Sequence, residues 1–444
     1  MSQTPAPDAP RLGLLLQRLI DVRAGEGRAV FWAFCYFFAL LSSYYILRPI
    51  RDEMGVTAGI DQMHWLFSGT FITMLLVVPV FGWITSRYRR RRFLPYIYGF
   101  FIANILLFHG LFESGLPPRQ VAPAFFIWLS VFNLFVVSVF WSLMNDLFDN
   151  AQARRLFGFI AAGGTLGAIA GPAVTATLVR QLGTSQMLLI SAALLGVAML
   201  CIARLLAWRN ATPAADRDAG PGVERQEAAL GGGILDGILL VVRSPYLLGI
   251  CLLILLYASL STFLYFQQAQ IVRDTFDDPA TRTAVFAAMD LAVNVLTLLT
   301  QVFATGRLVR WLGLGRTLAL MPLLLGLGFA LLGAFPLLPV LVTVQVLRRA
   351  GNYAIMRPTR EMLYVVLTRA EKYKAKNVID TLVYRGGDAL SSWVYAGMRG
   401  LGLSLSTIAW VAVPLSLLWA WVALRLGHRQ GEIAAAAGGR TTER

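Results

Sequence analysis

Long apolar runs recur along the whole sequence and constrain its fold more than any other feature. About twelve stretches reach the ~20 predominantly apolar residues that a helix needs to cross a bilayer. They lie near residues 29–49, 62–84, 93–113, 121–144, 157–179, 186–207, 245–268, 282–304, 315–334, 337–357, 378–398 and 404–425. Because backbone polar groups in lipid must be bonded within their own segment, such runs predict helices. The sequence therefore predicts an all-α integral membrane protein with about twelve transmembrane helices.

The composition agrees with this class and excludes several others. Hydrophobic residues make up 57% of the 444 residues and charged residues 14%, whereas soluble domains average about one half and one quarter. The net charge of +15 comes from basic residues between the apolar runs, so we expect it to report membrane orientation and not nucleic-acid binding. The three cysteines lie in apolar runs without CxxC spacing, and no catalytic triad or metal motif is present. We expect no enzyme activity, no cofactor and no metal.

One long polar interruption divides the apolar runs into two sets of six. It covers residues 209–233 and is predicted to be a cytoplasmic linker between a half at 29–208 and a half at 234–427. Residues 1–28 precede the first half and include an amphipathic pattern from residue 11, typical of a helix on the membrane surface. A cytosolic packing helix is the alternative for that stretch. Residues 428–444 form the predicted cytoplasmic tail.

The arginines between the apolar runs predict the orientation. The densest group lies at residues 86–92, and most other basic loops fall on the same side of the predicted membrane. By the positive-inside rule, both termini and the linker are cytoplasmic. A bacterial inner membrane is the expected location, and a monomer is the expected state.

One loop pattern repeats between the halves. The loop containing Gly82 and Arg87 and the loop containing Gly306 and Arg316 both resemble the basic loop that the major facilitator superfamily has after its second and eighth helices. A basic cytoplasmic loop without family significance is the alternative. Two tandem six-helix halves are the architecture of rocking transporters, whose substrate site lies near the membrane midplane.

Small residues follow one face of the predicted helix at 157–179. Gly163, Gly167 and Gly171 are spaced four apart, and no Gly-Lys-Ser/Thr or preceding strand accompanies them to suggest a phosphate loop. The pattern predicts close helix packing.

Ionisable residues within the apolar runs are the candidate functional groups, because charge at membrane depth is costly and normally faces a cavity or a partner. Arg348 and Arg349 have no acid within one helical turn. We therefore expect this pair to meet an anionic ligand, since a guanidinium binds carboxylate or phosphate oxygens two at a time. Arg385 and Asp388 are three residues apart and are predicted either to pair or to line the site.

Two tracts resemble the ATP/ADP translocase family, the nucleotide transporters of plastids and obligate intracellular bacteria. The first runs from Tyr44 to Ala58 and contains Ile46-Leu47-Arg48 and Arg51-Asp52; the second runs from Arg349 to Asp380. Phe140-Trp141-Ser142 and Asn145-Asp146 add a looser match. This resemblance implies the major-facilitator fold and transport of nucleotides by exchange.

The tracts also differ from the family at several positions. Arg51 and Arg360 stand where the family has lysine, and Leu129 and Tyr265 stand where it has acids. Asn352 replaces a lysine, and Arg357 replaces an acid. We therefore expect an anionic solute without naming ATP.

The resulting prediction is a secondary transporter that works by alternating access on a small anionic solute, such as a nucleotide or another phosphorylated or organic anion, within the lipid bilayer. The candidate substrate-binding residues are Arg48, Arg51, Arg348, Arg349, Asn352, Arg360 and Arg385. The candidate coupling or gating residues are Asp146, Asp290, Asp380 and Asp388. The alternatives are a proton-coupled exporter of an amphipathic molecule and a non-transporting membrane scaffold or sensor.

Overall fold

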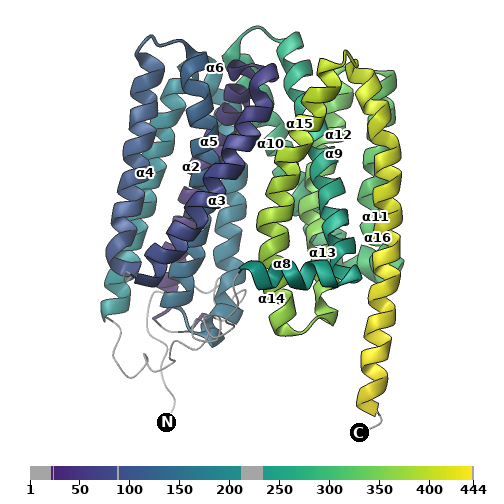
Figure 1. Cartoon of the computed structure of the whole chain (residues 1–444). Helices are drawn as coiled ribbons and strands as arrows, with labels where there is room; N and C mark the ends of the chain where they lie inside the picture. Colours follow the sequence, from purple (N-terminus) through teal and green to yellow (C-terminus); the bar gives the residue numbers. More distant parts are fainter. Residues whose placement is uncertain (1–21, 24, 88–89, 212–233, 443–444) are drawn as a thin grey trace, which may run out of the picture. The chain divides into compact units, whose positions relative to one another are not determined.

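The computed structural model describes residues 22–23, 25–87, 90–211 and 234–442 (Figure 1). Regular structure in these ranges is helical. Most of the predicted surface helix at 11–28 and most of the linker at 209–233 lie outside the described residues. Within the part of the chain that the structure describes, nine helical stretches are long and apolar enough to cross a membrane.

The described residues of the first half form five long helices. They are α2 (Gly27–Ala58), α3 (Met63–Arg87), α4 (Arg90–Glu113), α5 (Pro118–Leu147) and α6 (Asn150–Ala211), with a short 3₁₀ turn η1 (Ile60–Gln62) before α3. The 62 residues of α6 are interrupted at Gly183, where φ is 83°. Glycine adopts this left-handed conformation without a steric penalty. The break separates the two spans expected at 157–179 and 186–207.

The second half contains both long helices and shorter pieces. The helices are α8 (Ile234–Arg243), α9 (Pro245–Thr275), α10 (Pro279–Phe303), α11 (Thr305–Ala334), α12 (Leu338–Gly351), α13 (Arg357–Leu363), α14 (Arg369–Val378), α15 (Tyr384–Gly400) and α16 (Leu405–Thr442). A 3₁₀ turn η4 (Tyr364–Val366) follows α13. Gly313, with φ of 74°, interrupts α11 within the predicted basic loop.

Two π-helical turns interrupt the spans expected at 337–357 and 378–398. The turn η3 (Asn352–Met356) joins α12 to α13, and η5 (Ile379–Val383) joins α14 to α15. The twelve predicted spans are thus covered by these two interrupted helices, the two arms of α6 and the eight helices α2–α5, α9–α11 and α16. Turns of this kind are rare and occur frequently at functional sites.

The chain folds into two compact units that do not coincide with its two halves. Unit 1 contains residues 1–48, 81–115 and 132–222, and unit 2 contains residues 49–80, 116–131 and 223–444. The change of unit within α2 falls at Pro49, whose ring removes a backbone hydrogen bond. The predicted division into halves at 29–208 and 234–427 stays a prediction.

Unit 1 is held together by close packing of α2 on α6. Ideal Cβ atoms at Gly163 and Gly171 would lie 2.5 Å and 2.7 Å from the carbonyl oxygens of Phe34 and Ser42. Side chains at these positions would therefore force the two helices apart. The packing role predicted for the glycine pattern is confirmed.

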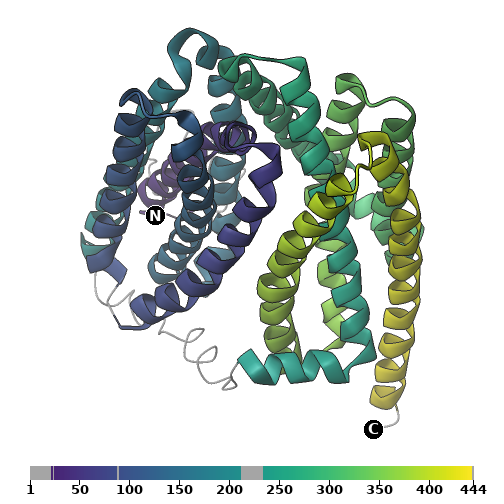
Figure 2. The ribbon, with the colours of Figure 1, turned by 45° about the horizontal axis from the view of Figure 1, so that its top comes forward.

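Unit 2 is built around α9, which packs against α12, α15 and α16. The helix α11 packs along α16, and α8 runs across the ends of the neighbouring helices beside α14 (Figures 1 and 2). Phe266, Phe329 and Trp419 are almost completely buried in this core. The core fixes α9, α10, α12 and α15, which carry most of the candidate site.

Candidate functional site

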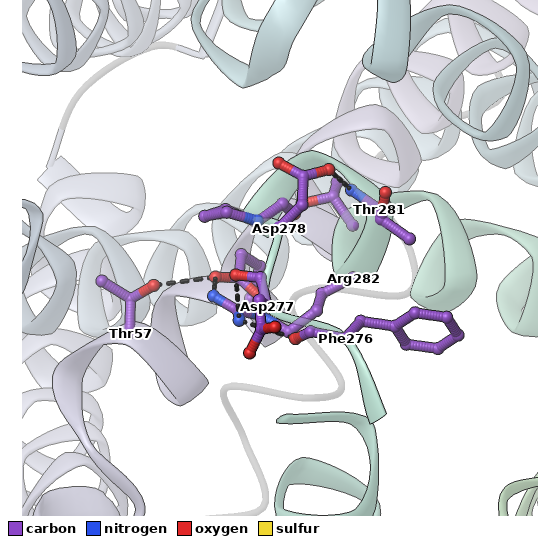
Figure 3. A network of polar contacts seen from close by, with 9 residues as sticks. Thr57, Phe276, Asp277, Asp278, Thr281 and Arg282 are labelled. Atoms are coloured by element: carbon purple, nitrogen blue, oxygen red, sulfur yellow. Dashed lines mark hydrogen bonds and ion pairs between the residues drawn. The ribbon is translucent and has the colours of Figure 1, made fainter. Parts of the chain in front are cut away.

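The C-terminal part of α2 ends in a buried ion pair with α10. Arg282 donates hydrogen bonds through Nε and Nη2 to the two carboxylate oxygens of Glu53, both at 2.7 Å. The Thr57 hydroxyl donates to the same carboxylate at 2.8 Å. Glu53 is fully buried and Arg282 is 9% exposed. Figure 3 shows this network, in which a bidentate pair fixes one end of unit 2.

Arg282 also holds the connection between α9 and α10. Its Nη1 donates to the carbonyl oxygens of Phe276 and Asp277 at 3.0 Å and 2.9 Å. Asp278 caps α10 by accepting a hydrogen bond from the Thr281 N–H at 2.7 Å. Hydrogen bonds from the Thr281 side chain and backbone lower the pKa of the Asp278 carboxyl. The cap therefore favours the ionised form near neutral pH.

The neighbouring residues of α2 use different partners. Tyr265 donates from its hydroxyl to Oδ1 of Asp52 at 2.9 Å, and the Arg51 guanidinium lies 4.2 Å from the centre of the Phe126 ring. Tyr265 occupies one of the positions where the ATP/ADP translocase resemblance implies an acid.

Arg349 does not match the prediction of an unpaired arginine. Its Nη2 lies 2.5 Å from Oδ1 of Asp290 on α10, and both side chains are buried. The sequence contains no local sign of this partner, because Asp290 lies on another helix, 59 positions earlier in the chain. Arg349 and Asp290 thus form a buried ion pair, and their roles as binding and coupling residues stay predictions.

Within the described residues, the hydrogen-bond partners of the Arg348 side chain are all neutral. Its Nε donates to Oε1 of Gln345 at 2.9 Å and its Nη1 to the Ser261 hydroxyl at 2.5 Å. Gln345 in turn donates to Gln268. Arg348 is only 8% exposed, and a buried cation without a bonded carboxylate is costly. This is the property expected of an anion-binding residue.

Three tyrosines act electrostatically on both Arg348 and Arg357. They are Tyr257 on α9, Tyr353 in η3 and Tyr384 at the start of α15. The Arg357 guanidinium lies 5.1 Å from the centre of the Tyr353 ring, and that of Arg385 lies 5.7 Å from the centre of the Tyr384 ring. The arginine–tyrosine cluster is defined here as Arg348, Arg357, Arg385, Tyr257, Tyr353 and Tyr384.

Asp388 is the acid associated with this cluster. Its Oδ2 lies 4.0 Å from Nη1 of Arg385, as the spacing of three predicted, and Thr262 donates to its Oδ1 at 3.4 Å. Arg348 and Arg51 also act on it electrostatically. Unit 2 thus brings together four residues predicted from the sequence, namely Arg51, Arg348, Arg385 and Asp388.

Other candidates lie in separate pairs. Arg360 and Asp380 are 3.5 Å apart, and Lys376 bonds Glu361 at 2.8 Å. Asn352 is buried in η3, where its carbonyl oxygen accepts the Arg357 N–H.

Two further candidates belong to unit 1. The Arg48 guanidinium lies 5.6 Å from the centre of the Tyr45 ring, and Asp146 is half-buried near the end of α5. Their roles as substrate-binding and gating residues stay predictions.

Sequence reasoning missed several members of this region. Glu53 and Arg282 form a bidentate pair, yet their spacing of 229 residues gives no local signal. Tyr257, Tyr353 and Tyr384 look like ordinary aromatic residues of apolar helices. Arg357 carried a usable signal, because it is a charge beside a proline within a run of apolar residues.

Comparison with protein families decides the class. The family model for the Major Facilitator Superfamily matches residues 28–372. The chain belongs to the Major Facilitator Superfamily. The match covers more than three quarters of the sequence and includes both predicted basic loops of this superfamily. The predicted all-α membrane fold is therefore confirmed.

Curated relatives match the chain almost from end to end. The ADP,ATP carrier protein 1 of Chlamydia muridarum is 23% identical, with 92% of this chain and 89% of the carrier covered. The ADP,ATP carrier protein 1 of Chlamydia trachomatis is 22% identical, with 93% and 91% covered. The similarity to ATP/ADP carriers predicted from two tracts is thus confirmed along the chain.

Solved structures of two transporters share the fold. The nucleoside transporter NupG matches with a TM-score of 0.63 at 15% identity, covering 91% of this chain and 99% of NupG. An auto-inhibited peptide transporter of the POT family matches with a TM-score of 0.59 at 16% identity, covering 92% and 97%. At these identities the similarity concerns the fold alone.

Proposed function

We propose that this protein is a secondary transporter that moves an anionic, phosphorylated solute of the nucleotide class across a membrane by alternating access. The observation that carries the proposal is Arg348, a buried arginine whose hydrogen-bond partners are Gln345 and Ser261. A bound phosphate supplies the missing negative charge and accepts two hydrogen bonds from one guanidinium.

The similar proteins support the choice of solute. The Chlamydia relatives are named ADP,ATP carriers, and the similarity covers nearly the whole chain. Arg51 and Arg385 add positive charge near Arg348, while Asp388 balances only part of it. An anion therefore gains more from this region than a neutral or cationic solute does.

The expected setting is the inner membrane of a bacterium, with both termini in the cytoplasm. The basic residues of the predicted loops at 86–92, 306–316 and 369–376 support this orientation. Site-directed labelling of single cysteines introduced in these loops, in intact and permeabilised cells, tests it.

Uptake into proteoliposomes tests the function. We expect labelled ATP, ADP or another phosphorylated anion to enter vesicles loaded with unlabelled counter-solute. Arg348→Ala should reduce this uptake at least tenfold, because charge-assisted hydrogen bonds contribute about 1.5–3 kcal/mol each. Arg425→Ala is the matched control, since Arg425 also lies over an aromatic ring, that of Trp421, but on α16.

The result that would reject the proposal is also specific. Transport restricted to neutral or cationic solutes, with equal rates for wild type and Arg348→Ala, would exclude an anion carrier. In that case efflux of an amphipathic solute driven by an inward proton gradient would favour the exporter alternative.

A further inference from the structure

We infer that Gln345 is a positioning residue for the solute: its neutral amide holds the Arg348 guanidinium in place without neutralising it, and so leaves the positive charge available to an anion. The inference rests on the proposed function, because it concerns the same arginine. Selectivity for charge is then set in part by a residue that carries no charge itself.

A chain of neutral side chains from α9 and α12 holds Arg348. Its Nε donates to Oε1 of Gln345 at 2.9 Å, and its Nη1 donates to the Ser261 hydroxyl at 2.5 Å. Nε2 of Gln345 donates in turn to Oε1 of Gln268. Gln345 and Gln268 are 1% and 2% exposed, so both amides depend on partners within the protein. The guanidinium is therefore fixed at two of its nitrogens from two different helices.

The chemistry of the donors decides how the Gln345 amide is oriented. Arginine donates through its N–H groups and accepts nothing, so the Gln345 atom that faces it must be the carbonyl oxygen. The other end of this amide, Nε2, is then a donor, and it meets the oxygen of Gln268. The chain from Arg348 to Gln268 thus satisfies its hydrogen bonds in a single direction and contains no carboxylate.

These bonds leave one end of the guanidinium fork for a ligand. An arginine side chain has five N–H donors, and Gln345 and Ser261 take one each from Nε and Nη1 of Arg348. No hydrogen bond from its Nη2 occurs among the described residues. The Nη1 and Nη2 groups together match two oxygens of a phosphate or carboxylate. The plane of the guanidinium is thus held while its outer edge keeps donors for an anion.

The adjacent arginine shows that α12 is also within reach of a carboxylate. Nη2 of Arg349 lies 2.5 Å from Oδ1 of Asp290 on α10, and both side chains are buried. Consecutive helical residues point about 100° apart, so Arg349 faces α10 while Arg348 faces α9. One arginine has its charge compensated by an ion pair, whereas the other has amide and hydroxyl partners. A buried cation of the second kind is costly until a ligand supplies the opposite charge.

Equilibrium binding to the purified full-length protein tests the inference. The probe is ATP or ADP, whichever binds wild type more tightly, and adenosine is the uncharged counterpart. Gln345→Glu keeps the length of the side chain but gives Arg348 a carboxylate partner, and Gln268 can turn its amide to donate to the second oxygen. Nucleotide affinity should fall at least tenfold, because the solute then competes with an internal ion pair. Adenosine affinity should change by less than about threefold, and the melting temperature should equal that of wild type or rise, since a buried charge gains a partner.

Gln345→Met separates positioning from charge. It removes the amide at nearly the same length, so Arg348 keeps its charge but loses the partner of its Nε. Nucleotide affinity should fall about threefold to tenfold. The matched control is Gln267→Met, because Gln267 is also 1% exposed but donates to the carbonyl oxygen of Leu405. This control should leave nucleotide affinity within about twofold of wild type.

A double variant shows whether the amide acts through the arginine. Once Arg348→Ala is present, Gln345→Met should cause no further loss of nucleotide affinity. A further loss there, unchanged affinity in a folded Gln345→Glu protein, or equal affinities of Gln345→Met and Gln267→Met would each overturn the inference while leaving the transporter proposal intact. If Gln345→Glu does not fold, the comparison of the two methionine variants decides. Failure of wild type to bind either nucleotide would instead reject the proposed function, and the inference with it.

Discussion

Glu53 and Arg282 are 229 residues apart in the chain, yet they form a bidentate ion pair with both hydrogen bonds at 2.7 Å. The pair joins the end of α2 to the first turns of α10 within unit 2. Because both side chains are buried, each charge depends on the other for compensation.

Removing one member of this pair should destabilise the protein strongly. Arg282→Gln leaves Glu53 buried without its cation and is expected to lower the free energy of unfolding by about 3–5 kcal/mol. Unfolding followed by circular dichroism in mixed micelles measures the change. The exposed Arg273 lies on the adjoining helix α9, and Arg273→Gln should change stability by less than about 0.5 kcal/mol.

A double-mutant cycle separates the pair from its surroundings. Glu53→Gln combined with Arg282→Gln should cost less than the sum of the two single changes, because the first substitution already removes the interaction. Strict additivity would contradict a direct contact between these residues.

The Glu53–Arg282 pair shows which kinds of contact the sequence predicts and which it does not. The apolar runs predicted the helices, because the length needed to cross lipid is a local property of each segment. Arg385 and Asp388 were also predictable, since three residues of spacing place them on one helix face. Glu53 with Arg282 and Asp290 with Arg349 were not, because their distances depend on how the helices pack. The three tyrosines of the arginine–tyrosine cluster were missed for the same reason.

Asp290 and Arg349 provide a second prediction, which concerns coupling. The sequence makes Asp290 a candidate coupling or gating residue, but its carboxylate lies 2.5 Å from Arg349 and both side chains are buried. We predict that its role is structural and that Asp290→Asn lowers the free energy of unfolding by about 3–5 kcal/mol. The combined Asp290→Leu and Arg349→Met substitutions should cost less than Asp290→Asn alone, because neither buried charge of this pair remains.

Transport assays with the Asp290→Leu/Arg349→Met protein complete that test. If the pair is structural, labelled solute still exchanges with the unlabelled solute inside loaded vesicles, and this exchange does not require a proton gradient. Gradient-driven uptake in wild type that disappears in this stably folded variant would show that Asp290 carries protons.

Asp278 gives a prediction for pH. Hydrogen bonds from Thr281 lower its pKa in the folded protein, so its stabilising effect is complete above the unfolded-state pKa of about 3.9 and is lost as the pH falls through the lower folded-state pKa. Asp278→Asn keeps a capping oxygen but cannot titrate. Wild type should therefore lose stability relative to Asp278→Asn as the pH falls from about 5 to about 3, and a constant difference over this range would contradict the assignment.

Asp278→Ala is the companion variant. It removes the cap and should cost about 0.5–2 kcal/mol at neutral pH. Asp278 lies at the start of α10 beside Arg282 (Figure 3). Transport kinetics measured on the same variant report whether loss of this cap in the α9–α10 connection changes the transport rate.

Glycines within α6 give a prediction in which two similar substitutions have opposite effects. A Cβ at Gly167 would overlap the carbonyl oxygen of Phe38 and lie 3.0 Å from the Ser42 nitrogen, both on α2, whereas nothing lies within 4 Å of a Cβ at Gly158. Gly167→Ala must move a helix backbone and should destabilise the protein by about 1–3 kcal/mol. Gly158→Ala only improves helix propensity and should stabilise it by up to about 1 kcal/mol. Thermal unfolding of the two variants beside wild type measures both, and stabilisation by Gly167→Ala would show that α2 and α6 do not pack this closely.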